Sequence, residues 1–273
     1  MELIHYSRSF TSKGFRNTDI VFRMENEPGI IHVASSPEQF LLERIPTEAD
    51  IAKCTFQRAT ALVEYLPVWE PYMLQVSEAI PLSEIYIKKL QNHAYIDAPE
   101  LVAAQTIKDL ENCQMLMQHP HPNVLPYFGC LVEDGRVTGL CFRKASKTLM
   151  EMVNPKMVLK VKFDASYHPL PNKEKLLQGW DAGIRHIHSI GYVHNDVHPT
   201  NLMVLDDGTP VVIDFDMLTK KGTIQYGGRC EWSDQEVSIA SEKRDWDGMQ
   251  EIRTWLDEGT EKKWLFGSHI NLV

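Results

Sequence analysis

This 273-residue sequence has one long stretch without glycine, no closely paired cysteines and no long apolar run. No glycine occurs between Gly29 and Gly129, so a glycine-rich loop in that stretch is excluded. The five cysteines are odd in number and form no Cys-x-x-Cys pair, which argues against a disulfide framework and a zinc site. Because no apolar run of about 18 residues and no apolar leader occurs, we expect a soluble protein of the cytoplasm, with the nucleus as an alternative.

Basic residues are also in the minority. The sequence has 28 Lys and Arg against 37 Asp and Glu, a net charge of -9, which argues against nucleic acid and anionic membranes as partners. Hydrophobic residues make up 43% of the chain, enough to build a core at this length. We therefore expect a globular protein with one large domain or two small lobes.

Apolar patterns predict most of the secondary structure beyond residue 80. Helical spacing predicts helices over residues 99–118 and 173–190, the second ending at Gly191. Strands are predicted at residues 83–90, 125–132 and 137–143, the last two joined by a tight turn. These elements lie in the order strand, helix, hairpin, helix.

The first 75 residues give a weaker pattern. Residues 19–24 and 31–35 flank the turn-like Asn-Glu-Pro-Gly at 26–29, which predicts a hairpin. Residues 36–45 open with a helix-cap pattern, so we expect a helix to begin there. No chemistry can be assigned to this segment from these patterns.

Chemically informative residues are concentrated in the run GYVHNDVHPTNLMVLDDGTPVVIDFD at positions 191–216. Asp196 lies 5 residues before Asn201, and Asn201 lies 13 residues before Asp214, a spacing that suits a hairpin returning to one edge of a site. The run resembles the catalytic loop H-R-D-L-K-P-E-N of protein kinases followed by their metal motif D-F-G. The sequence is thus similar to the protein-kinase-like superfamily.

This resemblance implies a role for each matched residue. Asp214 and Asn201 would hold Mg²⁺ on the phosphates of ATP. Asp196, with Asn201 beside it, would act on the acceptor hydroxyl as the base or orienting group. His194, packed beneath the loop, and Phe215 would be structural residues. The expected cofactors are therefore ATP and Mg²⁺.

A second resemblance lies upstream, at residues 84–88. The sequence EIYIK resembles the kinase strand V-A-I-K, which implies that Lys88 holds the phosphates of ATP. A predicted helix and the sequence His-Pro-Asn at 121–123 follow, in the order that protein kinases have. We expect Glu111 on that helix to be the acidic partner of Lys88, with Asp109 as the rival.

Residues 244–252, RDWDGMQEI, resemble the D-x-W-x-x-G helix of kinases. In that family the aspartate anchors the catalytic loop by hydrogen bonds to its backbone, and Asp245 takes its place here. Its implied role is structural.

Five departures separate this sequence from protein kinases. The glycine-rich phosphate loop is missing, and Asn195 replaces the catalytic-loop arginine, which argues against switching by phosphorylation. His198 replaces lysine, so D-V-H-P-T-N looks more like aminoglycoside and choline kinases and makes His198 a further catalytic candidate. Asp216 replaces the glycine of D-F-G, either as an added carboxylate near the metal or as part of a hydrogen-bonded turn. Between Asp214 and the region of Trp232 there is no A-P-E sequence, which in protein kinases supports peptide binding.

Residues 80–257 also resemble short fungal protein-kinase-like sequences that share these departures. We expect an α+β, two-lobed kinase-like fold with a small β-rich N-lobe and a mainly helical, truncated C-lobe. The expected parts are an N-terminal segment at 1–75, in or packed on the N-lobe, an N-lobe at 76–145 and a C-lobe at 146–273.

The favoured function is ATP- and Mg²⁺-dependent phosphotransfer to a protein serine or threonine hydroxyl. One alternative is a small-molecule kinase, and another is a pseudokinase that binds nucleotide or a partner. Retention of Asp196, Asn201 and Asp214 disfavours the pseudokinase, whereas the missing glycine loop favours it.

Overall fold

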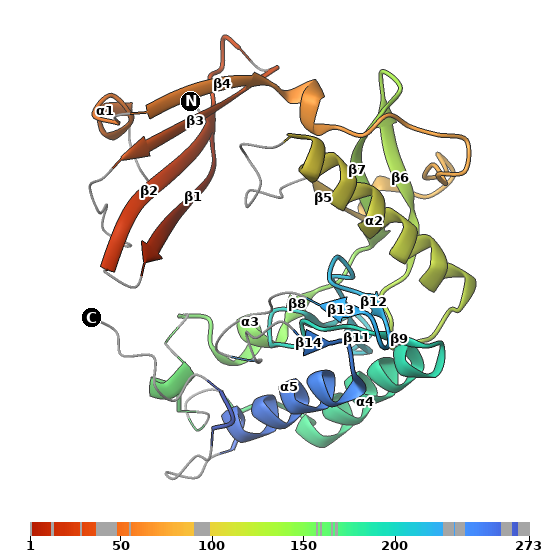
Figure 1. Cartoon of the computed structure of the whole chain (residues 1–273). Coiled ribbons are helices and arrows are strands. Elements are labelled where there is room, and N and C mark those ends of the chain that lie inside the picture. The colour runs from red at the N-terminus through yellow and green to blue at the C-terminus, as the bar shows by residue number, and fades with distance from the viewer. Residues whose placement is uncertain are drawn as a thin grey trace. The chain divides into compact units, whose positions relative to one another are not determined.

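The computed structural model describes residues 2–11, 14–27, 29–36, 48–54, 56–89, 99–156, 158, 160–164, 166, 169–225, 232, 238–257 and 264–266. Figure 1 labels the elements along the chain. The chain divides into two compact units. The first unit comprises Met1–Pro71, Lys89–Ile107 and Val132–Gly139, and the second comprises Tyr72–Lys88, Lys108–Leu131 and Leu140–Val273.

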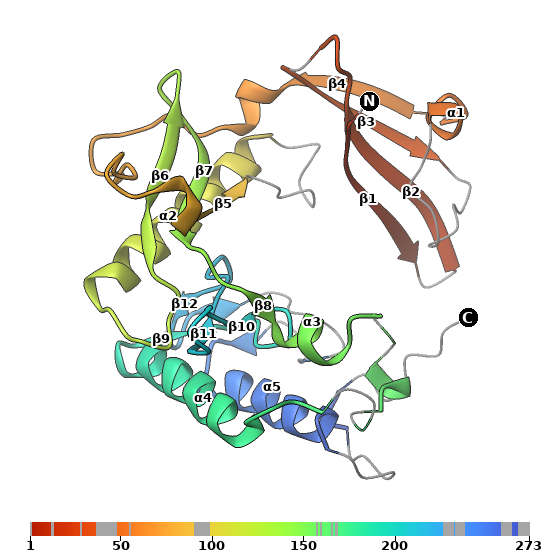
Figure 2. The same cartoon turned by 180° about the vertical axis from the view of Figure 1, so that it is seen from behind.

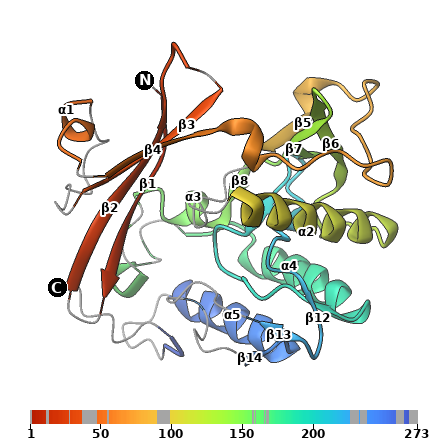
Figure 3. The same cartoon turned by 45° about the horizontal axis from the view of Figure 1, so that its top comes forward.

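An antiparallel meander makes up most of the first unit, as Figure 3 shows. Its strands, each paired with the next, are β1 (Glu2–Thr11), β2 (Gly14–Arg23), β3 (Ile30–Ser36) and β4 (Phe56–Ala61). In the β2–β3 register Ile20 pairs with Ala34, and Phe22 pairs with His32. The predicted hairpin is therefore confirmed as the middle of a larger sheet.

Successive side chains on a strand point to opposite sides, so the buried residues of this sheet form two clusters, one on each face. Ile20, Phe22 and Ala34 pack with Ile51 of α1 (Glu48–Ile51). The opposite cluster contains Val21, Ile31, Tyr65 and Val102. Tyr65 belongs to the 3₁₀ helix η1 (Leu62–Tyr65). The helix predicted over residues 36–45 lies outside the described residues.

A second sheet has the strand order β5-β7-β6 and lies mostly in the second unit. The strands are β5 (Ile85–Lys89), β6 (Tyr127–Glu133) and β7 (Arg136–Arg143), which confirms the three predicted strands. In the turn between β6 and β7, Asp134 and Gly135 have φ values of 49° and 73°, as a tight hairpin turn requires. The predicted helix is also confirmed, as α2 (Pro99–Gln118).

The rest of the second unit is built on two longer helices, α4 (Lys173–Ser189) and α5 (Glu242–Trp255), which lie side by side in Figure 2. Short elements complete it: η2 (Leu82–Glu84), β8 (Lys147–Thr148), α3 (Leu149–Val153), η4 (Lys160–Lys162), β9 (Tyr192–Val193), β10 (Leu202–Val204), β11 (Pro210–Val212), β12 (Thr219–Lys220), β13 (Ile224–Gln225) and β14 (Ser238–Ile239). The small sheets have the orders β11-β10-β8, β12-β9 and β13-β14.

Helix α4 fixes the hairpin that carries the site. Trp180, Ile184 and Ile187 recur at helical spacing and are fully buried. At Gly183 an added Cβ would lie 2.4 Å from the main-chain oxygen of Asn123, so only glycine permits this approach. Asn123 in turn accepts the N–H of Val212 at 2.9 Å, which fastens β11 beside α4.

The α+β fold class is confirmed, with β-rich sheet regions and a few helices, as in a kinase-like fold. None of the helices in the described residues is long and apolar enough to cross a membrane.

Candidate active site

Lys88 is the centre of a charged cluster that we define as Lys88, Asp109, Asp214 and Asp216. Its Nζ atom lies 2.9 Å from Oδ2 of Asp109 and 2.6 Å from Oδ1 of Asp214. Strand β5 supplies the lysine, α2 supplies Asp109, and the loop after β11 supplies the other two carboxylates. One ammonium group thus joins three segments that lie far apart in the sequence.

Burial and charge act in opposite directions on this cluster. Burial disfavours the ammonium of Lys88, but attraction to Asp214 and Asp109 outweighs it and the pKa of Lys88 is raised. Burial raises the pKa of Asp109, and Lys88 offsets part of that rise. Burial and then repulsion from Asp214 raise the pKa of Asp216 to about 6. Three carboxylates around one lysine leave surplus negative charge, which a bound cation would neutralise.

Loop 194–201 holds the other motif residues and is folded on itself by hydrogen bonds. Nδ2 of Asn201 donates to the main-chain oxygen of Asp196 at 2.9 Å and to its Oδ2 at 3.1 Å. Because the amide nitrogen of Asn201 donates to Asp196, the amide oxygen Oδ1 points away from Asp196. An Asn side chain that binds a metal must present its oxygen in this way.

His198 is buried against Asp196 in a single tautomer. Its Nδ1 accepts the main-chain N–H of Thr200 at 3.3 Å and lies 2.8 Å from the Thr200 hydroxyl. The proton must therefore be on Nε2, which donates to Oδ2 of Asp196 at 3.1 Å. With Asn201, His198 gives this carboxylate two donors on one oxygen, which fixes its orientation.

His194 connects loop 194–201 to the strand that leads to Asp214. The ring is fully buried; its Nδ1 accepts the N–H of Asp196 at 3.3 Å, and its Nε2 donates to the main-chain oxygen of Ile213 at 2.9 Å. The ring of Phe215 lies edge-on to it at 6.0 Å. One buried side chain thus links Asp196 to the residue before Asp214, and the N–H of Ile213 adds a second link by donating to the main-chain oxygen of Asn201 at 3.0 Å.

Asp245 on α5 fastens the same loop from below. Its buried carboxylate accepts the N–H groups of His194 and Asn195 at 2.8 and 2.7 Å. Its Oδ2 also lies 2.7 Å from Nε2 of His188 on α4. Two helices therefore hold the start of the loop through one aspartate.

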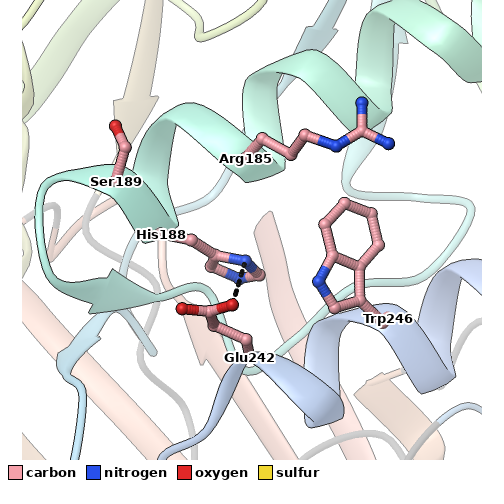
Figure 4. A pocket seen from close by; sticks show the side chains of 5 residues that line it. All are labelled: Arg185, His188, Ser189, Glu242 and Trp246. Carbon is pink, nitrogen blue, oxygen red and sulfur yellow. Dashed lines mark ion pairs between the residues drawn. The ribbon is translucent and has the colours of Figure 1, made fainter.

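A surface hollow opens over this anchor between α4 and α5, as Figure 4 shows. Arg185 of α4 lies over the ring of Trp246 of α5 at 5.3 Å. Beside this pair, Nδ1 of His188 faces Glu242 at 3.9 Å, and Glu242 also pairs with Lys221 at 2.6 Å. The charged side chains of the hollow thus already have partners on the protein, with Arg185 also 3.9 Å from Asp181.

Backbone strain coincides with the site. Asn195 and Asp214 have φ values of 68° and 65°, in the left-handed region that non-glycine residues seldom adopt. At Asn195, Nδ2 donates to the main-chain oxygens of Val193 and Met217 at 3.0 Å each. The strained conformations are adjacent to Asp196 and at Asp214, where the chemistry would take place.

Helix α2 also holds the segment that follows Asp214. Nδ2 of the buried Asn112 donates to the main-chain oxygens of Phe215 and Leu218 at 2.8 and 3.1 Å. Because Asp109 lies one turn earlier on the same helix, both carboxylate partners of Lys88 are fixed relative to α2.

The structure brings together most of the residues that the sequence singled out. The exception is Glu111, whose expected place beside Lys88 is taken by Asp109. Lys88 contacts Asp109, the rival candidate, whereas Glu111 is exposed two residues further along α2. Sequence reasoning missed Asn112, His188 and Thr200. Only Asn112 had a usable signal, because it lies next to Asp109 and Cys113 on the apolar side of the predicted helix.

The stretch where protein kinases have a glycine-rich hairpin is an irregular segment here, with turns at residues 71–73 and 78–80. Gln114 of α2 accepts the N–H of Leu74 at 2.6 Å and donates to the main-chain oxygen of Tyr72 at 3.2 Å. Cys130 of β6 pairs with the same segment, through Leu74 at 2.7 Å and Val76 at 2.9 Å. Among described residues 66–84 there is no β-hairpin before β5.

A magnesium ion fits the oxygen donors of this site, although the fit depends on a nucleotide. Among the described residues no group of three His, Cys, Asp or Glu side chains could hold a metal alone. Mg²⁺ in phosphoryl-transfer sites uses one or two protein oxygens and takes the rest from phosphate and water. Asp214 and Asn201 provide such a pair.

The sequence around this site matches known phosphotransferases. The APH family, described as Phosphotransferase enzyme family, matches residues 159–221, which include loop 194–201 and Asp214. The matches support membership of the protein-kinase-like superfamily. A kinase-like chain also accounts for the order of β5, α2, loop 194–201 and α5 along the sequence.

Two relatives extend the kinase-like comparison. The chain is 24% identical to the Serine/threonine-protein kinase Tao of Drosophila melanogaster over 149 residues, 52% of this chain and 13% of that protein. It is 33% identical to Serine/threonine-protein kinase 16 of Mus musculus over 70 residues, 24% of this chain and 23% of that protein. The kinase-like chain thus spans less than a quarter of either relative.

Proposed function

We propose that this kinase-like chain transfers the terminal phosphoryl group of ATP to a hydroxyl group in the presence of Mg²⁺. The observation that carries the proposal is the contact of Lys88 with both Asp109 and Asp214. Phosphoryl transfer needs little covalent help, but it needs neutralised charge and an oriented nucleophile. The charged cluster meets the first need and loop 194–201 meets the second.

Each motif residue would act at a defined atom. The ammonium of Lys88 would bind phosphate oxygens, with Asp109 holding it in place. Asp214 and Oδ1 of Asn201 would hold Mg²⁺, which neutralises charge on the phosphates when bound. The Asp196 carboxylate would accept the hydrogen bond of the acceptor hydroxyl, in the orientation that His198 and Asn201 impose.

We propose a protein serine or threonine as the acceptor. The relatives named above are serine/threonine-protein kinases, and the order of β5, α2 and the His-Pro-Asn turn at 121–123 follows protein kinases.

A small-molecule hydroxyl is the second candidate acceptor. His198 is 2% exposed and donates to Asp196, in the stretch that the APH phosphotransferase family matches. A histidine at this position also resembles small-molecule kinases, which supports this second candidate.

Nucleotide binding tests the proposal first. Melting temperatures of the wild-type chain are measured with millimolar ATP, with and without Mg²⁺. We expect a rise that needs both, and Asp214→Ala should remove the dependence on Mg²⁺. No rise for the wild type would contradict both acceptor candidates, and the chain would then fit a pseudokinase.

Transfer is tested with γ-labelled ATP offered to a peptide library and, separately, to a metabolite extract. We expect label in peptides, with Asp196→Asn lowering transfer at least about 100-fold while ATP binding persists. Label in small molecules alone would reject the protein acceptor and leave the second candidate.

A further inference from the structure

A short turn directly follows Asp214 and is closed by its own main chain. The N–H of Leu218 donates to the main-chain oxygen of Phe215 at 3.1 Å, so residues 215–218 form a β-turn. Phe215 and Leu218, the two ends of this turn, are both buried. The turn is therefore held inside the fold immediately after the carboxylate that the proposed function assigns to Mg²⁺.

Asn112 of α2 holds this turn from the side of the helix. Its Nδ2 donates to the main-chain oxygens of Phe215 and Leu218 at 2.8 and 3.1 Å, so one amide group spans the two ends of the turn. The side chain is 9% exposed. Asparagine is a poorer helix former than leucine, and its amide costs free energy to bury without partners. The two hydrogen bonds to the turn offset that cost.

Asp214 depends on contacts made by its neighbours, because its own backbone is strained. Its φ value of 65° lies in the left-handed region, a conformation that persists only where the surrounding structure holds it. Before it, the N–H of Ile213 donates to the main-chain oxygen of Asn201 at 3.0 Å. After it, Asn112 holds the main-chain oxygen of Phe215. The main chain is thus fixed directly before and directly after Asp214.

Asn112 also connects this turn to the helix that orients Lys88. Asp109, three residues earlier on α2, lies 2.9 Å from Nζ of Lys88, and Asp214 lies 2.6 Å from the same atom. One helix thus supplies both a partner for the lysine and a support for Asp214. Without Asn112, the contact with Lys88 would remain, but the main chain after Asp214 would lose its support from α2.

We propose that Asn112 is a positioning residue for Mg²⁺, which acts by holding the turn after Asp214 so that this carboxylate meets the metal in one orientation. The proposal rests on the proposed function, because both assign Asp214 to Mg²⁺. Groups that stand behind a metal ligand set its orientation, and their loss typically weakens metal binding about 10- to 100-fold. In this role Asn112 touches neither the nucleotide nor the metal.

Binding of AMP-PNP, an ATP analogue that resists hydrolysis, tests the proposal without catalysis. Titration calorimetry on the full chain gives the Kd of AMP-PNP over a range of Mg²⁺ concentrations. We expect Asn112→Leu to raise the Mg²⁺ concentration for half-maximal binding about tenfold. At saturating Mg²⁺ its Kd should come within about twofold of the wild type, because Lys88 and its partners are unchanged. A chain that is merely damaged would bind weakly at every Mg²⁺ concentration.

Gln114→Leu is the matched control. It removes another amide of α2 that holds main-chain groups, those of Tyr72 and Leu74, in a different segment. This variant should keep the Mg²⁺ requirement of the wild type. If Asn112→Leu does not fold, Asn112→Ala carries the same expectation.

The outcomes separate the role of Asn112 from the proposed function. An unchanged Mg²⁺ requirement in the folded Asn112 variant overturns the positioning role, although the wild type still binds AMP-PNP. An equal rise in Gln114→Leu overturns it as well, because the effect would then be general to α2. Failure of the wild type to bind AMP-PNP with Mg²⁺ overturns the proposed function, and the positioning role with it.

Discussion

Loop 194–201 and the charged cluster are stabilised in different ways. The loop is held by a network in which the backbone N–H groups of His194 and Asn195, and the side chains of His198 and Asn201, have buried partners within the protein. The charged cluster has three carboxylates around one ammonium group. Most hydrogen-bonding groups of the loop are thus paired within the chain, whereas the cluster keeps surplus negative charge.

The two regions therefore suit different tasks: loop 194–201 suits holding a group in a fixed orientation, and the charged cluster suits binding a charged ligand. A satisfied polar network is rigid and keeps its geometry without a ligand. A cluster with surplus negative charge is completed by a cation. Under the proposed function, the geometry for the acceptor would therefore be built into the fold, whereas the geometry for the phosphates would depend on Mg²⁺ and nucleotide.

Asp245→Ala should have the largest effect, because it breaks the network that holds the loop. The change leaves the N–H groups of His194 and Asn195 and the ring of His188 without their buried acceptor. We expect unfolding in urea to require about 3 kcal/mol less free energy. Asp247→Ala, which removes an exposed pair with Lys243, should change stability by less than about 0.5 kcal/mol. Equal losses for the two variants would contradict a special role for Asp245.

Lys88→Met should damage the charged cluster and leave loop 194–201 intact. It removes the ammonium between Asp109 and Asp214, so we expect the affinity for ATP with Mg²⁺ to fall at least about tenfold. Titration calorimetry measures the effect. Lys89→Met, at the exposed neighbouring position on β5, should bind ATP as the wild type does. If the two variants bind ATP equally, Lys88 does not contact the nucleotide.

The acidic partner of Lys88 can be tested on α2. Asp109→Asn should lower kcat/KM for ATP about tenfold, because one of the two carboxylates that orient the ammonium loses its charge. Glu111→Gln, at an exposed position of the same helix, should leave kcat/KM within about twofold. The reverse order would restore Glu111 as the partner that the sequence favoured.

Thr200 allows a smaller test of the loop. Thr200→Val removes the hydroxyl beside Nδ1 of His198, and the histidine loses part of what fixes its tautomer toward Asp196. We expect kcat to fall about tenfold with an unchanged KM for ATP. Thr200→Ser keeps the hydroxyl and should behave as the wild type. A rise in KM at constant kcat would instead place Thr200 in nucleotide binding.

Asp216 should give the smallest effect, a change of stability with pH in EDTA. Its pKa rises from 3.8 to about 6 in the fold, so the folded chain binds the proton more tightly than the unfolded chain does. Stability is therefore greatest below the unfolded pKa and falls as pH rises from about 4 to about 6. Asp216→Asn should remove this loss, as urea unfolding at several pH values would show. An unchanged pH profile in the variant would exclude Asp216 as its origin.

The sequence predicted the local parts of this fold well. The helices α2 and α4 and the strands β5, β6 and β7 follow from apolar spacing and turn residues, because these signals act within a few residues. The spacing of Asp196, Asn201 and Asp214 also put the site residues near one another before the structure did.

Contacts between distant segments were harder to predict. Asp109 and Glu111 are both carboxylates on one helix, and choosing between them requires knowing which face of α2 is buried. A signal existed: Val102, Thr106, Cys113 and Leu116 share helical spacing with Asp109, and all are buried. Helical spacing could mark Asn112 as buried, but it could not name its partners or the donors to Asp245, because these bonds join residues 50 to 106 positions apart.

The two hydrogen bonds from Asn112 have a consequence for inhibitor design. Compounds that need the main chain at Phe215 to move away from α2 would have to break the buried bond from Asn112 to the Phe215 oxygen before they could bind. Molecules that leave Phe215 in place would meet no such barrier. In this chain, selective compounds should therefore be sought among those that accept the present position of Phe215.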